Sequence, residues 1–77
     1  MNSFGDRLKD LRQDNDLTQE ELAKILNITR TALSNYENTD REPSFDLLIK
    51  IADFFNVTLD YLLCRTNLKT KYYKPSK

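Results

Sequence analysis

The apolar residues of this 77-residue chain recur with the period of an α-helix throughout, and no segment alternates with the period of a strand. Each predicted helix also begins directly after a serine or threonine, which are preferred capping residues at helix starts. The spacing and the caps together predict an all-α chain of five helices. These helices are expected over residues 4–14, 19–26, 30–37, 45–55 and 59–63, after caps at Ser3, Thr18, Thr29, Ser44 and Thr58.

Asparagine is expected to end helices in this chain, because the sequence has only one glycine. Asn27, Asn38 and Asn56 each come just after a predicted helix. Asn tolerates the left-handed backbone conformation that often follows a helix and is usually adopted by Gly. Only two or three residues separate the second predicted helix from the third, so these two helices should cross steeply.

A chain of 77 residues has room for one small domain, which buries only about 60% of the surface that its unfolded chain exposes. The predicted helix over residues 45–55 is apolar around most of its circumference, so we expect it to be the hub of the domain. Any apolar edge left uncovered on this helix is a candidate partner surface. The expected core consists of Phe4, Leu8, Leu11, Leu22, Leu26, Leu33, Leu48, Ile51, Ala52 and Leu62.

The net charge of zero hides an uneven distribution. Residues 1–64 carry 7 basic and 12 acidic side chains, a net charge of −5, whereas residues 65–77 carry 5 basic side chains and no acidic one. We therefore divide the chain into a globular domain over residues 1–64 and a basic C-terminal tail over residues 65–77. The tail is either a solvated terminus or an additional contact with a negatively charged partner.

Several classes of function are excluded by composition. With no His and a single Cys64, the chain has almost no means of building a metal, haem or iron–sulfur site, and no Ser–His or Cys–His pair for catalysis. No apolar run approaches the roughly 20 residues of a membrane span. A lone cysteine fits a reducing cytoplasm. We therefore expect a cytoplasmic binding module without a cofactor or metal, and not an enzyme.

The third predicted helix divides into an apolar and a polar face. On a helical wheel, Arg30, Thr31, Ser34, Asn35 and Asn38 share the polar side. In the major groove of DNA, Arg pairs with guanine and Asn with adenine, while Ser and Thr hydrogen-bond to several bases. Taken alone, such a face is also what an ordinary solvated helix presents.

The segment from Gln19 to Asn38 resembles the helix-turn-helix unit. Its core positions are apolar, Ala23 is small where the two helices cross, and Asn27 takes the turn. The strings Leu-Thr-Gln-Glu-Glu-Leu-Ala, Ile-Thr-Arg-Thr-Ala-Leu-Ser-Asn-Tyr-Glu-Asn and Arg-Glu-Pro-Ser extend the likeness over about residues 3–64. The chain is thus similar to the Cro/C1-type (XRE-like) family of bacterial and phage repressors. This resemblance implies a five-helix, lambda-repressor-like DNA-binding domain in which the second and third helices form the helix-turn-helix.

The resemblance also implies roles for individual residues. The base contacts in the major groove fall to Arg30, Thr31, Ser34 and Asn35. The phosphate contacts that position the protein on DNA fall to Thr18, Gln19, Asn38 and Arg41. Gln19 is also expected to brace the recognition helix. Arg12 and Glu37 are expected to form a partly buried bidentate ion pair that ties the first helix to the end of the third.

The expected function is therefore that of a sequence-specific regulator that binds double-stranded DNA, most simply a bacterial or phage-encoded repressor associated with the nucleoid. One recognition helix contacts too few base pairs to select an operator, so we expect a homodimer on an inverted repeat. The dimer can be weak enough to form only on DNA. The candidate contact surface lies around Phe54, Val57 and Leu59.

Two alternatives remain open at the level of the sequence. An antitoxin or a restriction–modification controller would have the same domain. A protein-interaction module would keep the fold but would show an apolar patch in place of the polar face of the third helix, and the acidic balance of residues 1–64 supports it.

Overall fold

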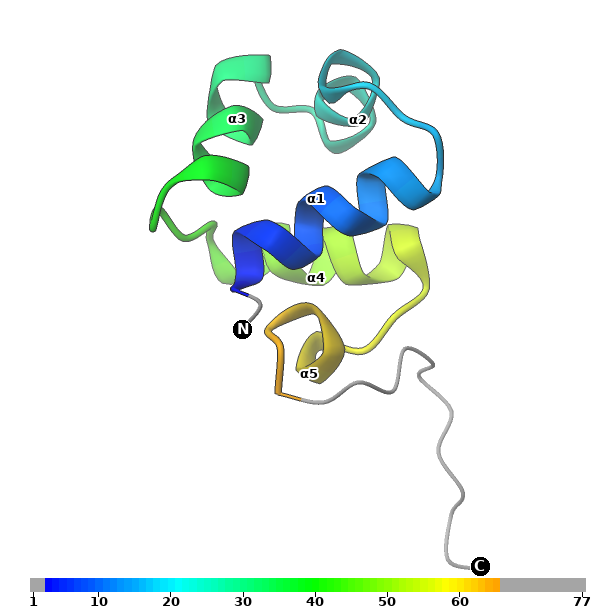
Figure 1. Ribbon diagram of the computed structural model, residues 1–77, viewed down its shortest axis with the longest axis vertical. Helices are drawn as coiled ribbons and strands as arrows, with labels where there is room; N and C mark the ends of the chain where they lie inside the picture. The colour runs from blue at the N-terminus through cyan, green and yellow to red at the C-terminus, as the bar shows by residue number, and fades with distance from the viewer. Residues whose placement is uncertain (1–2, 66–77) are drawn as a thin grey trace, which may run out of the picture.

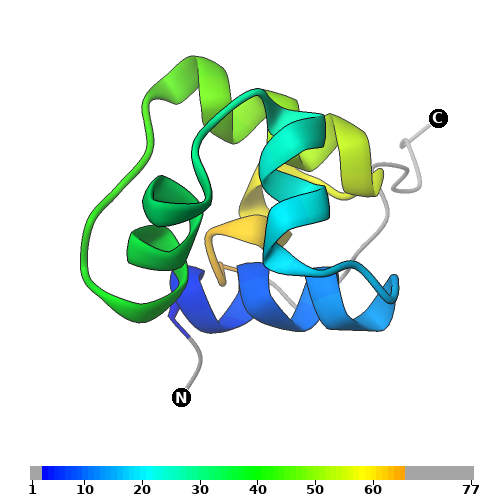
Figure 2. The same ribbon diagram turned by 90° about the horizontal axis from the view of Figure 1, so that it is seen from above.

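The computed structural model describes residues 3–65, and in this part of the chain it contains five helices and no strand. The described part of the chain is all-α, as its periodicity predicts. Figures 1 and 2 show α1 and α4 on opposite sides of the domain, with α2 and α3 together at one end and α5 at the other. The helices are α1 (Phe4–Asp14), α2 (Gln19–Leu26), α3 (Arg30–Asn38), α4 (Phe45–Phe55) and α5 (Leu59–Leu62). In the described residues, no helix is long and apolar enough to cross a membrane.

The helix starts are fixed by local hydrogen bonds, and all five predicted caps are confirmed. Each capping side chain accepts from the backbone N–H three residues further on. Ser3 with Asp6, and Thr18 with Glu21, form reciprocal capping boxes. These bonds satisfy backbone donors that a helix cannot pair internally.

The helix ends agree with prediction at two of the three asparagines. Asn27 and Asn56 follow α2 and α4 in the left-handed conformation, with φ of 60° and 57°. The prediction that Asn38 lies just past a helix is wrong, because Asn38 is the last residue of α3. Thr39 ends this helix with an extended backbone, and its Oγ1 donates to the carbonyl oxygen of Asn35 at 2.6 Å. A threonine hydroxyl thus replaces the left-handed turn.

Cys64 occupies the left-handed position after α5, with φ of 65°. The helix ends one residue earlier than predicted, and Leu63 is its C-cap. A left-handed backbone costs about 1–2 kcal/mol for a residue with a side chain, so glycine would suit this position better. The tail from residue 66 onward lies outside the described residues.

The core differs from the predicted one at four positions. Phe4 and Leu48 are only partly buried and pack against its edge, whereas Ala23 and Val57 belong to it. Helix α4 is less covered than its apolar composition suggests, because the side chains of Phe45, Ile49 and Phe54 are exposed. The buried apolar side chains are Leu8, Leu11, Leu22, Ala23, Leu26, Leu33, Ile51, Ala52, Val57 and Leu62.

A buried arginine joins α1 to α5. Arg7 is 6% exposed, its Nη1 donates to the carbonyl oxygen of Tyr61 at 3.0 Å, and its guanidinium lies 3.8 Å from the centre of the Tyr61 ring. The contact combines a charge-assisted hydrogen bond with a cation–π interaction. The burial of Arg7 was not predicted from the sequence, although Arg7 lies on the same helical stripe as Leu8 and Leu11.

The only glycine of the chain lies at a close approach of α1 to α3. A Cβ atom at Gly5 would lie 2.7 Å from the carbonyl oxygen of Glu37 and 2.8 Å from that of Tyr36. The absence of a side chain therefore lets the first turn of α1 rest directly on the backbone of the last turn of α3.

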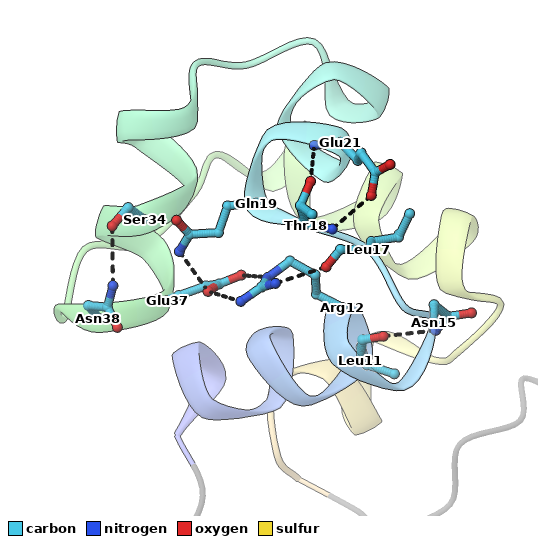
Figure 3. Close-up of polar contacts among 10 residues, drawn as sticks. All are labelled: Leu11, Arg12, Asn15, Leu17, Thr18, Gln19, Glu21, Ser34, Glu37 and Asn38. Atoms are coloured by element: carbon cyan, nitrogen blue, oxygen red, sulfur yellow. Dashed lines mark hydrogen bonds and ion pairs between the residues drawn. The ribbon is translucent and has the colours of Figure 1, made fainter.

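An ion pair holds the same two helices together, as the resemblance implied. Arg12 donates to the carboxylate of Glu37 twice, from Nε at 2.7 Å and from Nη2 at 3.1 Å (Figure 3). The Glu37 side chain is completely buried and the Arg12 side chain is 11% exposed. Arg12 Nη1 also donates to the carbonyl oxygen of Leu17 at 2.9 Å, which holds the segment leading into α2.

We predict that Gly5→Ala destabilises the domain, although alanine favours an isolated helix over glycine by about 1 kcal/mol. The added methyl group would force α1 away from α3 and lower the free energy of unfolding by about 1–3 kcal/mol. Urea denaturation measures this change. Lys9→Ala, at an exposed position of the same helix, is the control and should stay within about 0.5 kcal/mol of the wild type. A stabilised Gly5→Ala protein would contradict the close approach.

We predict that Arg12→Met lowers the free energy of unfolding by about 3–5 kcal/mol, because the buried Glu37 carboxylate loses its charged partner. The double variant with Glu37→Met removes both charges and should recover most of that loss. Thermal unfolding of the single and double variants measures the coupling between the two side chains. Equal destabilisation by the single and the double change would show that the ion pair is not the cause.

Candidate nucleic-acid interface

A polar hollow of about 250 Å³ opens on the surface between α2 and α3. It is lined by Gln19, Arg30, Thr31, Ser34 and Asn35. The four residues predicted to contact bases are thus brought together, and the side chain of Gln19 joins them from α2.

The position of these side chains follows from the local structure. Helix α3 begins at Arg30, directly after its capping residue Thr29. The left-handed backbone of Asn27 makes the sharp turn between α2 and α3. The apolar face of α3 is anchored by the fully buried Leu33. The opposite face is therefore held outward, where it adjoins the first turn of α2.

The hollow is chemically suited to recognising polar groups. Its five side chains provide a guanidinium, two hydroxyls and two amides, and no apolar or acidic side chain lines it. The edges of base pairs in the major groove carry the matching donors and acceptors. Within residues 3–65, the side chains of Arg30, Thr31 and Asn35 form no hydrogen bond or ion pair with the rest of the domain. Their polar groups are therefore available to a partner.

Glu37, the only acidic residue of α3, does not line the hollow, and its charge is paired with Arg12. The carboxylate of Glu37 is buried against Arg12, and its Oε1 also accepts from Gln19 Nε2 at 3.1 Å. This bond joins α2 to α3 at the edge of the hollow (Figure 3). A bracing contact from Gln19 to the recognition helix is therefore present.

Of the four residues expected at phosphates, Gln19 lines the hollow, whereas Thr18, Asn38 and Arg41 do not. Asn38 is exposed, and its Nδ2 donates to Ser34 Oγ at 3.2 Å, which places it one turn further along α3. Arg41 is exposed in the loop before α4. The hydroxyl and the backbone N–H of Thr18 are both used in the capping box with Glu21, so its side chain has a structural task.

The three dimer candidates are not equivalent. Phe54 is 43% exposed and Leu59 is partly buried, but Val57 is only 2% exposed. The prediction that Val57 offers a contact surface is wrong, because this side chain packs into the core after the end of α4. A second hollow, of about 290 Å³, includes Ile49, Val57 and Leu59 in its lining, whereas Phe54 is not part of it.

One structural contact near the helix-turn-helix was missed by the sequence analysis. Lys50 of α4 donates from Nζ to the carbonyl oxygen of Leu26 at 3.1 Å. A cation at the C-terminal end of α2 is favoured by the helix dipole. The positive charge of Lys50 does not reveal this hydrogen bond, since the two residues lie 24 positions apart in the sequence.

In the described residues, no three His, Cys, Asp or Glu side chains gather as a metal site requires.

The family model described as helix-turn-helix matches residues 8–62 of the chain. The transcriptional regulator ImmR of Bacillus subtilis is 45% identical over 69 residues, which are 90% of this chain and 54% of ImmR. The transcriptional activator BcrR of Enterococcus faecalis is 42% identical over 67 residues, which are 87% of this chain and 33% of BcrR. The chain thus spans about half the length of ImmR and a third of BcrR.

The domain also resembles a solved repressor structure. The P22 c2 repressor, crystallised in complex with a synthetic operator, superimposes with a TM-score of 0.76 at 25% identity. The match covers 82% of this chain and 96% of the repressor chain. The matched family model, the relatives and the five-helix fold lead to one conclusion: this chain belongs to the Cro/C1-type helix-turn-helix family.

Proposed function

We propose that this chain is a transcriptional regulator that binds double-stranded DNA in a sequence-specific manner, most simply as a repressor. The observation that carries this proposal is the hollow lined by Gln19 and the four polar residues of α3. These are the side-chain types that read base edges.

In the proposed complex, α3 lies in the major groove. Arg30 would make a bidentate contact with guanine and Asn35 one with adenine, while Thr31 and Ser34 would make smaller contacts beside them. Asn38 and Arg41 are exposed at the end of α3 and in the loop after it, where they would contact phosphates. The start of α2, capped by Thr18, would lie against the backbone on the other side. These phosphate contacts would fix the register and leave the choice of sequence to α3.

The relatives support regulation by binding and not by catalysis. ImmR and BcrR are named as transcriptional regulators, BcrR as an activator, and the P22 c2 repressor is held on an operator. Repression requires no further domain or partner, because a protein bound at an operator is enough to block polymerase. A bacterial or phage-encoded protein of this kind would work in the cytoplasm at the nucleoid.

The hollow also separates this function from that of a protein-interaction module. The buried core of a protein–protein interface is more apolar than the rest of the surface and poor in charged residues. The exposed apolar residues of the described chain are Ile25, Phe45, Ile49, Phe54 and Leu63, and none of them lines the hollow. The polar character of this surface therefore favours DNA.

Two copies of the chain are proposed to act together on an inverted repeat. A single recognition helix contacts too few base pairs to distinguish one operator in a genome. The second hollow offers apolar surface for this contact through the exposed Ile49 and the partly buried Leu59, with Val57 closing its floor from within the core. Phe54 would contribute at another side of α4.

In-vitro selection from random duplex DNA tests the proposal, and variants separate the two classes of contact. Arg30→Ala and Asn35→Ala should each lose roughly 1–3 kcal/mol of discrimination at one base pair. Arg41→Ala should weaken binding to all sequences about equally and reduce its dependence on salt. Enrichment of no sequence by the wild type would refute specific binding. An unchanged half-site for Arg30→Ala would remove that residue from base reading.

Footprinting on the selected site tests the symmetric arrangement. We expect two inverted half-sites whose centres lie about 10–10.5 base pairs apart, or a multiple of that distance. The free protein can be monomeric, because a weak dimer forms readily once both copies are held on one duplex. Protection of a single asymmetric, unrepeated site by one copy would rule out the paired arrangement.

A further inference from the structure

The amide of Gln19 is held in one orientation by a buried partner. Its Nε2 lies 3.1 Å from Glu37 Oε1, and the Glu37 side chain is completely buried. An ionised carboxylate only accepts hydrogen bonds, so the group that faces it has to be the nitrogen. The reversed amide would place two acceptors 3.1 Å apart and leave Glu37 with donors from Arg12 alone.

The fixed nitrogen determines what Gln19 offers to the outside. With Nε2 turned toward Glu37, the carbonyl oxygen of Gln19 is turned toward α3, on the side of Ser34 (Figure 3). Gln19 and Ser34 both line the polar hollow. Within the described residues, Gln19 Oε1 has no hydrogen-bond donor. Gln19 therefore presents an unoccupied acceptor beside the residues proposed to read bases.

An acceptor at this place does not fit a phosphate, because the phosphate oxygens are acceptors as well. It fits the donors of the major groove, which are the exocyclic amines at N6 of adenine and N4 of cytosine. The second proton of Nε2 is still able to reach a phosphate, but the oxygen needs a different partner. The family resemblance gives Gln19 a contact with phosphate. That contact can involve Nε2, but it leaves Oε1 without a partner.

We propose that Gln19 is a specificity-determining residue whose Oε1 accepts a hydrogen bond from the exocyclic amine of a base, and that Glu37 is the positioning residue that fixes its amide. This inference rests on the proposed DNA-binding function. It extends base reading from α3 to the first residue of α2, and it makes a buried ion pair part of the choice of sequence.

Selection from random DNA with the wild type and Gln19→Lys tests this role. Lysine keeps a donor for Glu37 or for a phosphate but has no acceptor. We expect the wild type to prefer an amine-bearing base about fivefold at one position, the strength of one neutral hydrogen bond. Gln19→Lys should lose that preference and keep those at the other positions. Glu20→Gln is the matched control, because it changes the net charge equally at the neighbouring exposed residue.

Base analogues test the same contact on the wild-type protein. At the identified position, adenine is replaced by purine or cytosine by 2-pyrimidinone, which removes only the exocyclic amine. The complementary strand is kept. Wild-type affinity should fall about fivefold relative to the same analogue placed in the flanking sequence. The affinity of Gln19→Lys should not respond to the position of the analogue.

The outcomes separate this inference from the function on which it rests. If the wild type selects a site and Gln19→Lys shows the same preference at every position, Gln19 does not read a base. If removal of the amine leaves wild-type affinity unchanged, the acceptor contact is absent even where the variant is too unstable to measure. If the wild type enriches no duplex, the DNA-binding function itself fails.

Discussion

The side chain of Glu37 has no contact with solvent, and a carboxylate in such a place costs several kcal/mol unless donors surround it. Three N–H groups reach it here, two from Arg12 and one from Gln19. Arg12 belongs to α1, Gln19 to α2 and Glu37 to α3, so one carboxylate connects three helices (Figure 3). The placement of α3 against α1 and α2 therefore depends on this buried group.

The remaining constraints act on the same helix from its two ends. At its start, the left-handed Asn27 and the cap at Thr29 fix the turn from α2. At its end, Gly5 lets α1 rest on the backbone carbonyls of the last turn. Helix α3 has only 9 residues and would not be stable alone, because isolated helices shorter than about 12–15 residues are marginal in water. Its stability comes from its neighbours.

The sequence predicted most of the fold because most of it depends on local interactions. Serine and threonine caps, left-handed asparagines and the helical period act over three or four residues, and they gave the bounds of the helices to within one residue. The errors at the ends of α3 and α5 shift a boundary by one residue, and the larger errors concern contacts between distant segments. Val57 is buried because α5 folds back on α4, and nothing within a few residues of Val57 reveals this. The need for glycine at position 5 and the hydrogen bond of Lys50 both depend on backbone carbonyl groups far along the chain. The pairing of Arg12 with Glu37 was predicted only through the family resemblance.

The side chains of the polar hollow differ in how strongly the fold depends on them, and this difference has an evolutionary consequence. Arg30, Thr31 and Asn35 form no side-chain hydrogen bond within the described domain, so mutations there can accumulate without loss of stability. Gln19 is bound to Glu37, and a change at this position perturbs the carboxylate that joins three helices. Under the proposed function, paralogues would diverge rapidly in the bases read by α3. They would retain an ancestral preference at the base that we propose Gln19 reads.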